Sequence, residues 1–157
     1  MLISLLILLA GQYVFTKYKI EDALLNRLQQ VEYVDKVDIK QDAGIFNVNI
    51  SFKHIDNFKD AYEKVREIVN KSLGKRSFKI NIDNNPDRLL THIFNKRIQF
   101  VIYEAINTGK YDEMRAKLEE IRAEFPVEIN VFIDRNNLYL HLEHDEHRLY
   151  HIVELTD

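Results

Sequence analysis

Cysteine and tryptophan are absent from the 157-residue chain, which also contains only four glycines and two prolines. Without cysteine the chain has no disulfide, no thiolate nucleophile and no cysteine-ligated zinc or iron–sulfur site. The glycines are isolated at positions 11, 44, 74 and 109, so no glycine-rich phosphate-binding loop is present. No HExxH or DxDxDG motif occurs either. We therefore assign no catalytic, cofactor-binding or metal-binding residues from motifs.

A strong excess of charge of either sign is also missing, because the formal net charge is −3. Residues 16–84 carry 13 basic and 11 acidic side chains, whereas residues 85–157 carry 9 and 14. Phosphate backbones attract basic surfaces, so the acidic second half argues against binding to nucleic acid. Hydrophobic residues make up 46% of the chain, which is enough to bury a core and excludes global disorder.

A long apolar run is found only at the amino terminus, where it begins at Met1, ends at Phe15 and reads MLISLLILLAGQYVF. As a helix it would span about 22 Å, which is less than the roughly 30 Å of a bilayer's hydrocarbon core. Snorkelling of Lys17 and Lys19 can extend that reach. We therefore expect residues 1–17 to form a single-pass membrane anchor. A buried or oligomer-forming helix and a cleaved signal peptide are the alternatives.

Basic residues flank this run on one side only. Lys17, Lys19 and Arg27 follow it, and no lysine or arginine precedes it. The positive-inside rule then predicts that the bulk of the chain lies on the cytoplasmic side of the membrane.

Two small α+β domains are expected after the anchor. The hydrophobic periodicity of residues 18–84 predicts the order α-β-β-α-β, with a hairpin turn at residues 41–44 and a helix that ends at Gly74. Residues 85–157 are predicted to form an αα-hairpin, divided at Gly109, followed by a three-stranded antiparallel sheet. The sequence Asn-Asn-Pro-Asp at residues 84–87 marks the boundary, with Pro86 expected at the first helical position.

The one unusual cluster of side chains is the sequence HLEHDEHRLYH, which holds four of the six histidines. Its ionisable members are His141, Glu143, His144, Asp145, Glu146, His147, Arg148 and His151. Imidazoles and carboxylates at this density can bind Zn²⁺ or another divalent ion, or form a pH-sensitive patch.

A hairpin geometry weakens the metal hypothesis. If residues 144–147 form the turn, Glu143 lies opposite Arg148 and Leu142 opposite Leu149. His141 and His151 then point to opposite faces of the sheet, and only His144 and His147 share one place. We therefore expect a solvated turn rather than a specific metal site.

Other candidate residues receive structural interpretations. His54 and His92 lack the serine or aspartate spacing of a catalytic triad. Glu104 is interpreted as an exposed carboxylate at a helix edge, although a buried carboxylate is the alternative. The phenylalanines, Phe100 among them, fall mostly at core spacing.

The segments LLNRLQQVEYVDKVDIK, FNVNISF and AYEKVREIV, in the order α-β-β-α-β after a membrane segment, resemble the ring-building-motif proteins of bacterial secretion and sporulation channels. The resemblance covers residues 19–83. A weaker one is to the cytoplasmic domain of cation diffusion facilitators. The first resemblance implies self-assembly through this domain, whereas residues 85–157 resemble no family that we can name.

These observations lead to one main hypothesis. The chain is expected to be a non-enzymatic, single-pass membrane protein that assembles with itself or with a protein partner, in a bacterial envelope or sporulation process. The alternative is a sensor or small-ligand-binding module formed by residues 85–157. An enzyme that uses the histidine-rich hairpin is the third hypothesis, although no nucleophile, base and orienting group can be assembled for it.

Overall fold

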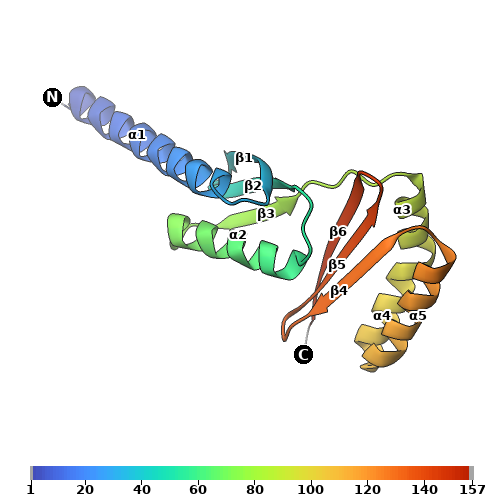
Figure 1. The fold of residues 1–157 in the computed structure, drawn as a ribbon. Coiled ribbons are helices and arrows are strands. Elements are labelled where there is room, and N and C mark those ends of the chain that lie inside the picture. Colours follow the sequence, from blue (N-terminus) through green and yellow to red (C-terminus); the bar gives the residue numbers. More distant parts are fainter. Residues whose placement is uncertain (1, 156–157) are drawn as a thin grey trace. The chain divides into compact units, whose positions relative to one another are not determined.

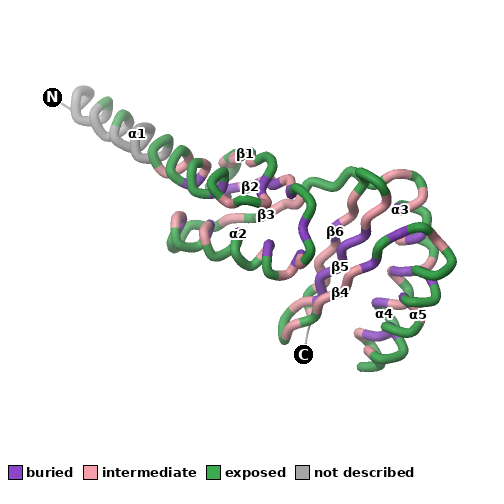
Figure 2. The backbone as a smooth tube through the Cα atoms, viewed as in Figure 1, coloured by how far each residue is buried: buried purple, intermediate pink, exposed green. Residues whose placement is uncertain are grey.

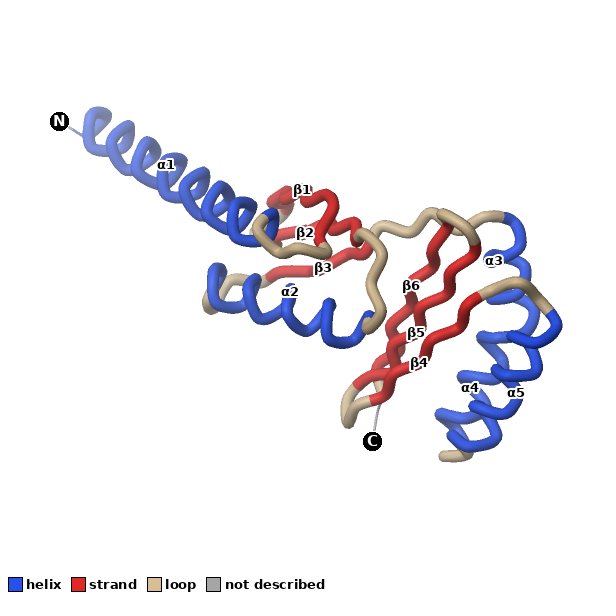
Figure 3. Tube along the Cα trace, in the orientation of Figure 1, coloured by secondary structure: helices blue, strands red, loops and turns tan. Residues whose placement is uncertain are grey.

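The computed structural model describes residues 2–155, with side chains in the first helix described at Ile7, Gly11 and from Tyr18 onward. The chain folds into two compact units. The first consists of Met1–Ile55 and Asp60–Asp83, and the second of Asp56–Lys59 and Asn84–Asp157. Each contains helices and one three-stranded sheet (Figures 1 and 3), so the predicted α+β class is confirmed.

The first unit contains α1 (Leu2–Gln29), β1 (Val34–Asp42), β2 (Ile45–Phe52), α2 (Phe58–Leu73, apart from its first two residues) and β3 (Phe78–Ile82). Its strands lie in the order β1-β2-β3, where β1 and β2 are antiparallel and β2 and β3 are parallel. The parallel pair requires a crossover connection, which α2 provides.

One face of this sheet is buried because its strands alternate apolar and polar residues. In β2 the buried positions are Phe46, Val48, Ile50 and Phe52. The β1–β2 turn is Ala43–Gly44, both with positive φ, as a type I′ hairpin turn requires. Leu24 and Leu28 of α1 and Val65 and Val69 of α2 are completely buried. Figure 2 colours the buried segments purple.

Helix α1 differs from the expected arrangement of a separate anchor followed by a short helix. It is continuous for 28 residues, from Leu2 to Gln29. Within the described part of the chain, no helix combines the length and the apolarity that crossing a membrane requires. Most side chains of residues 1–17, on which the anchor hypothesis depends, lie outside that described part.

The second unit contains α3 (Arg88–Ile93), a π-helical turn η1 (Phe94–Ile98), α4 (Gln99–Thr108) and α5 (Tyr111–Glu124). These are followed by β4 (Glu128–Ile133), β5 (Asn137–His144) and β6 (His147–Glu154). The strands form an antiparallel sheet in the order β4-β5-β6, and the helices cover one of its faces (Figure 1).

A single apolar core lies between these helices and the sheet. From the helices it takes Leu90, Ile93, Ile98, Ile102 and Ala105, together with Met114, Leu118 and Ile121 of α5. From the strands it takes Ile129, Leu138, Leu140 and Leu142.

The π turn explains a spacing that a regular helix does not. Ile93 and Ile98 are both buried although they are five residues apart, one more than an α-helical turn allows on one face. The prediction of one long α-helix ending at Gly109 is therefore correct about its end, where Gly109 has φ +71, and wrong about its continuity. Phe100 is 62% exposed, so its assignment to the core was also wrong.

Candidate functional site

The β5–β6 hairpin has the predicted register. Leu142 pairs with Leu149 and Glu143 with Arg148, and the ladder continues to His144 opposite His147. The turn itself is therefore only Asp145 and Glu146, shorter than the expected four residues. Asp145 adopts φ +52, a left-handed conformation that aspartate tolerates better than most residues.

This register separates His141 from His151. His151 lies on the helix side of the sheet, where its ring meets Phe94 edge-on at 5.1 Å between centroids. Burial lowers the pKa of His151. His141 lies on the opposite face, is 1% exposed and stacks on the ring of Tyr150 at 4.7 Å. The two histidines therefore cannot ligate one ion.

Beside His141, the face of the sheet away from the helices carries an ion pair and a buried tyrosine. An Nη of Arg148 lies 3.3 Å from a carboxylate oxygen of Glu143, which is the predicted cross-strand pair. A second Glu143 oxygen is 3.6 Å from Nε2 of His141. Burial raises the pKa of Tyr150 to about 12, so this phenol stays protonated at physiological pH. These side chains form a largely buried polar layer on that face of the sheet.

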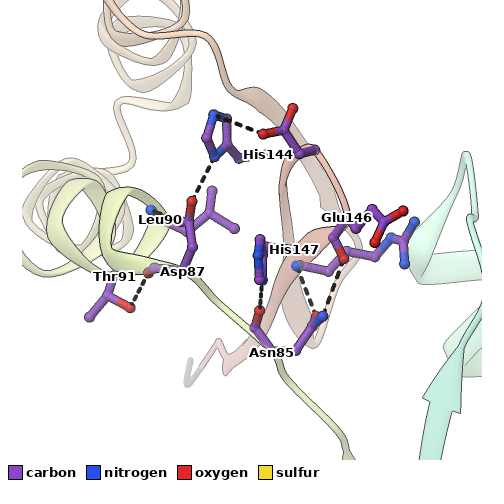
Figure 4. Close-up of polar contacts among 9 residues, drawn as sticks. Asn85, Asp87, Leu90, Thr91, His144, Glu146 and His147 are labelled. Atoms are coloured by element: carbon purple, nitrogen blue, oxygen red, sulfur yellow. Dashed lines mark hydrogen bonds and ion pairs between the residues drawn. The ribbon is translucent and has the colours of Figure 1, made fainter.

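The turn histidines are not simply solvated, contrary to the expectation (Figure 4). Nδ1–H of His144 donates to a carboxylate oxygen of Asp87 at 2.7 Å, and the two side chains are only 21% and 22% exposed. Nδ1–H of His147, an exposed residue, donates to the carbonyl oxygen of Asn85 at 2.8 Å. Sequence reasoning missed both contacts because they join residues 57 and 62 positions apart.

Asp87 connects this hairpin to the first helix of the second unit. It is the N-cap of α3, and its Oδ1 accepts the Leu90 N–H at 2.8 Å. That hydrogen bond, together with the one from His144, holds the pKa of Asp87 below its usual value. The expected placement of Pro86 at the first helical position is therefore wrong: Pro86 precedes the cap, because the side chain that can accept a helix N–H belongs to Asp87.

Asn84 and Asn85 cover the outer edge of β6 at Arg148 and Tyr150, with both side-chain amides and one backbone N–H. Asn85 Oδ1 accepts the Arg148 N–H at 3.0 Å, while the Asn85 N–H donates to the Arg148 carbonyl at 3.1 Å. Asn84 Oδ1 accepts the Tyr150 N–H at 2.6 Å, and its Nδ2 donates to the Tyr150 carbonyl at 3.2 Å. Four backbone groups of the edge are thus satisfied as a neighbouring strand would satisfy them.

The other edge of the sheet, β4, has no such cover within the described residues. The backbone N–H and C=O groups of Arg148 and Tyr150 point away from β5. In an antiparallel ladder these groups alternate between the two sides of a strand, so the registers of β6 with β5 and of β5 with β4 determine which β4 residues point outward. By that alternation the N–H and C=O groups of Ile129, Val131 and Ile133 point outward. These residues also line a groove of about 420 Å³ between β4 and α5.

Charged side chains of α5 line the same groove. They are Asp112, Arg115, Glu119 and Arg122, between 45% and 99% exposed. Sequence reasoning did not single out this stripe, although its alternating signs at spacings of three and four residues were visible. The sequence could not show that the helix lies beside an open strand edge.

The remaining candidate residues do not extend the site. His54 and His92 are exposed, and Glu104 is an exposed partner of Lys117 at 2.6 Å. Among the described residues, no group of three or more histidine or carboxylate side chains is arranged to hold a metal ion.

Comparisons with known proteins add no family, since the chain matches no family model, no curated protein and no solved structure. The role of the site therefore follows from its geometry. That geometry offers backbone pairing and charge complementarity, which are the means of protein–protein contact.

Proposed function

We propose that the chain is a non-enzymatic, membrane-anchored protein that assembles with copies of itself or with a protein partner. The observation that carries this proposal is the continuity of α1. At one end Leu24 and Leu28 are completely buried in the first unit, and at the other end Ile7 is 68% exposed. One helix thus joins a folded unit to an apolar segment in which the side chain of Ile7 is largely exposed.

An isoleucine so exposed, within a run of other apolar residues, indicates a surface that another apolar phase covers. A bilayer supplies that phase, and full burial of one such side chain contributes about 1.5–3 kcal/mol. Tyr18 is 62% exposed at the end of the run and is followed by Lys19. A tyrosine and a lysine in this place suit the interface between lipid and water.

The order of elements in the first unit supports the assembly part of the proposal. Residues 19–83 run through the end of α1, β1, β2, α2 and β3, the order on which the resemblance to ring-building-motif proteins rests. By that resemblance we propose a bacterial envelope or sporulation setting. The positive-inside argument from Lys17, Lys19 and Arg27 adds a cytoplasmic location for the two units.

A sensor or small-ligand-binding role is the second candidate, and the groove between α5 and β4 favours it. A volume of about 420 Å³ lies in the range of small-molecule sites. Its lining of opposite charges and strand backbone suits an extended polypeptide better than a small apolar ligand. We therefore place this role second.

The proposal can be tested by fractionating cells that express the full chain. We expect the protein in the membrane fraction, resistant to high salt and released by detergent. Ile7→Lys introduces a charge into the apolar run, which costs up to about 3 kcal/mol in a membrane-spanning helix, so this variant should shift toward the soluble fraction.

Ala23→Lys is the matched control, because Ala23 is an exposed position of the same helix within the first unit. It should fractionate like the wild type. Recovery of the wild-type full chain as a soluble monomer without detergent would overturn both the anchor and the assembly.

A further inference from the structure

We propose that α5 and the outer edge of β4 form a two-fold interface with a second copy of the chain. The two β4 strands would pair antiparallel, joining two three-stranded sheets into one of six strands. This inference rests on the proposed assembly function and gives that function a surface and a partner.

The backbone of β4 specifies a strand as its partner. Ile129, Val131 and Ile133 direct three N–H and three C=O groups outward, and no described residue of the chain accepts or donates to them. An unpaired edge of this kind is a template for another strand. Two copies of one edge related by a two-fold axis pair antiparallel, with Ile129 opposite Ile133 of the second copy and Val131 near the axis.

The charges of α5 indicate that this partner strand belongs to a second copy of the chain. Along the helix the groove-lining charges alternate as Asp112, Arg115, Glu119 and Arg122. The same two-fold axis sets two α5 helices antiparallel. Asp112 then faces Arg122 of the second copy, and Arg115 faces Glu119. All four contacts join opposite charges, so the stripe is complementary to itself, as an isologous interface requires.

The centre of the charged stripe on α5 and the centre of the open edge of β4 lie at similar distances from Pro126, in the loop that joins α5 to β4. The charged stripe is centred on Lys117, nine residues before Pro126, or about 14 Å along a helix. Val131 lies five residues after Pro126, or about 16 Å along a strand. One axis can therefore pass through both centres. The open edge requires a strand as its partner, and the self-complementary charges favour a second copy over an unrelated peptide.

A competing explanation is that the β4 edge is open without any partner using it. The rest of the sheet argues against this explanation. The part of the β6 edge at Arg148 and Tyr150 is covered by Asn84 and Asn85 through four hydrogen bonds. The β4 edge has no proline, and Ile133 at its end is 38% exposed. Proteins protect such an edge unless a partner uses it.

The experiment uses the full chain in mild detergent and reverses the whole stripe at once, with Asp112→Arg, Arg115→Asp, Glu119→Arg and Arg122→Glu. The reversed stripe keeps its two pairings within α5, Arg115 with Asp112 and Arg122 with Glu119, and stays complementary to itself. Where a reversed stripe meets a wild-type stripe, each of the four contacts joins two charges of the same sign. Tagged and untagged copies are mixed, and mixed dimers are measured by co-purification, while light scattering gives the mass of each form alone.

We expect wild type and reversed variant each to be dimeric, and mixed dimers to fall from about half of the dimers to below about a tenth. Two single changes complete the set. Ile133→Lys places a charge on the edge and should weaken association at least about tenfold. Glu120→Arg, at an exposed α5 position outside the groove lining, should leave it unchanged.

Free mixing of the reversed variant with the wild type would place the association elsewhere, for example in the first unit, and would overturn this interface while leaving the proposed function standing. A monomeric wild-type chain would overturn the interface as well. Membrane fractionation then decides separately whether the anchor survives.

Discussion

The two edges of the β4–β5–β6 sheet are treated in opposite ways. At β6, the side chains of Asn84 and Asn85 occupy the backbone groups of Arg148 and Tyr150. At β4, the backbone groups of Ile129, Val131 and Ile133 face a groove beside α5. The chain thus protects part of one edge, at Arg148 and Tyr150, and leaves the other edge available. An exposed strand edge is a hazard that proteins manage, so an unmanaged edge indicates a partner.

The contrast also separates two uses of polar residues. On the β6 side, asparagine, aspartate and histidine are used for internal hydrogen bonds that fix the start of α3 to the hairpin. On the α5 side, charged residues are mostly exposed and alternate in sign. The first arrangement contributes to folding, and the second is suited to recognition.

The largest expected effect on stability comes from a change in β5, the central strand that pairs with both edge strands. Leu142 in β5 is 0% exposed, and Leu142→Ala removes its contacts in the core. We expect the free energy of unfolding to fall by about 2–5 kcal/mol. Urea denaturation measures this loss, and a loss below about 1 kcal/mol would show that the core is placed wrongly.

Uncovering the β6 edge should have the next largest effect. The double variant Asn84→Ala with Asn85→Ala removes three side-chain hydrogen bonds to Arg148 and Tyr150. Water can replace part of them at this edge, so we expect a loss of about 1–3 kcal/mol. Amide exchange at Arg148 and Tyr150 should accelerate in the variant, and unchanged rates would contradict the cover.

Removing the cap of α3 should cost less. Asp87→Ala deletes the acceptor for the Leu90 N–H and the partner of His144, and N-cap losses cost about 0.5–2 kcal/mol. A thermal melt measures the change. The cost should approach zero if Asp87 is not the cap.

The pH dependence of Asp87→Asn is a separate test of the same carboxylate. The Asp87 pKa is lowered in the fold, so its ionised form stabilises the folded state above about pH 4, the usual pKa of aspartate. That stabilisation is lost as the pH falls through the folded pKa. Asparagine can still cap the helix without a charge. The stability advantage of the wild type over Asp87→Asn should therefore shrink on acidification, and an advantage that grows would reverse the assignment.

The turn histidines should differ from each other. His144→Asn loses a charge-assisted contact to Asp87 that is four-fifths buried, so we expect a cost of about 1 kcal/mol. His147 is exposed, and His147→Asn should cost no more than about 0.5 kcal/mol. Parallel melts with and without zinc compare the two variants. Equally small costs would restore the expectation of a solvated turn, whereas a zinc-dependent rise in melting temperature would favour the metal site that the sequence analysis set aside.

The smallest effect on stability is expected at the open edge. Ile133→Lys changes a partly exposed end of β4 that has no hydrogen-bonded neighbour outside. In dilute monomer the free energy of unfolding should change by about 0.5 kcal/mol or less. A larger loss under these conditions would mean that the chain itself covers this edge.

Much of this architecture could be predicted from local patterns. Alternation of apolar residues placed Leu142 opposite Leu149 and sent His141 and His151 to opposite faces, because a strand has a fixed period of two. Gly74 and Gly109 marked helix ends, since both adopt positive φ there.

The features that define the candidate site were beyond such patterns. Asn84 and Asn85 meet β6 across 62 to 66 positions of sequence, and no local rule predicts which strand edge an asparagine will satisfy. The π turn at Phe94–Ile98 was missed because five-residue spacing of Ile93 and Ile98 also fits an ordinary helix with one partly apolar face. Strand order, which makes β4 an edge, depends on the whole fold.

The most direct test is hydrogen exchange at the two edges, followed against protein concentration in the detergent-solubilised full chain. At low concentration the amides of Ile129, Val131 and Ile133 should exchange rapidly, while those of Arg148 and Tyr150 are protected. At high concentration the β4 amides should become protected as well, and the β6 amides should not change. Protection of the β4 amides that is already complete in the monomer, or that never develops as concentration rises, would contradict the account.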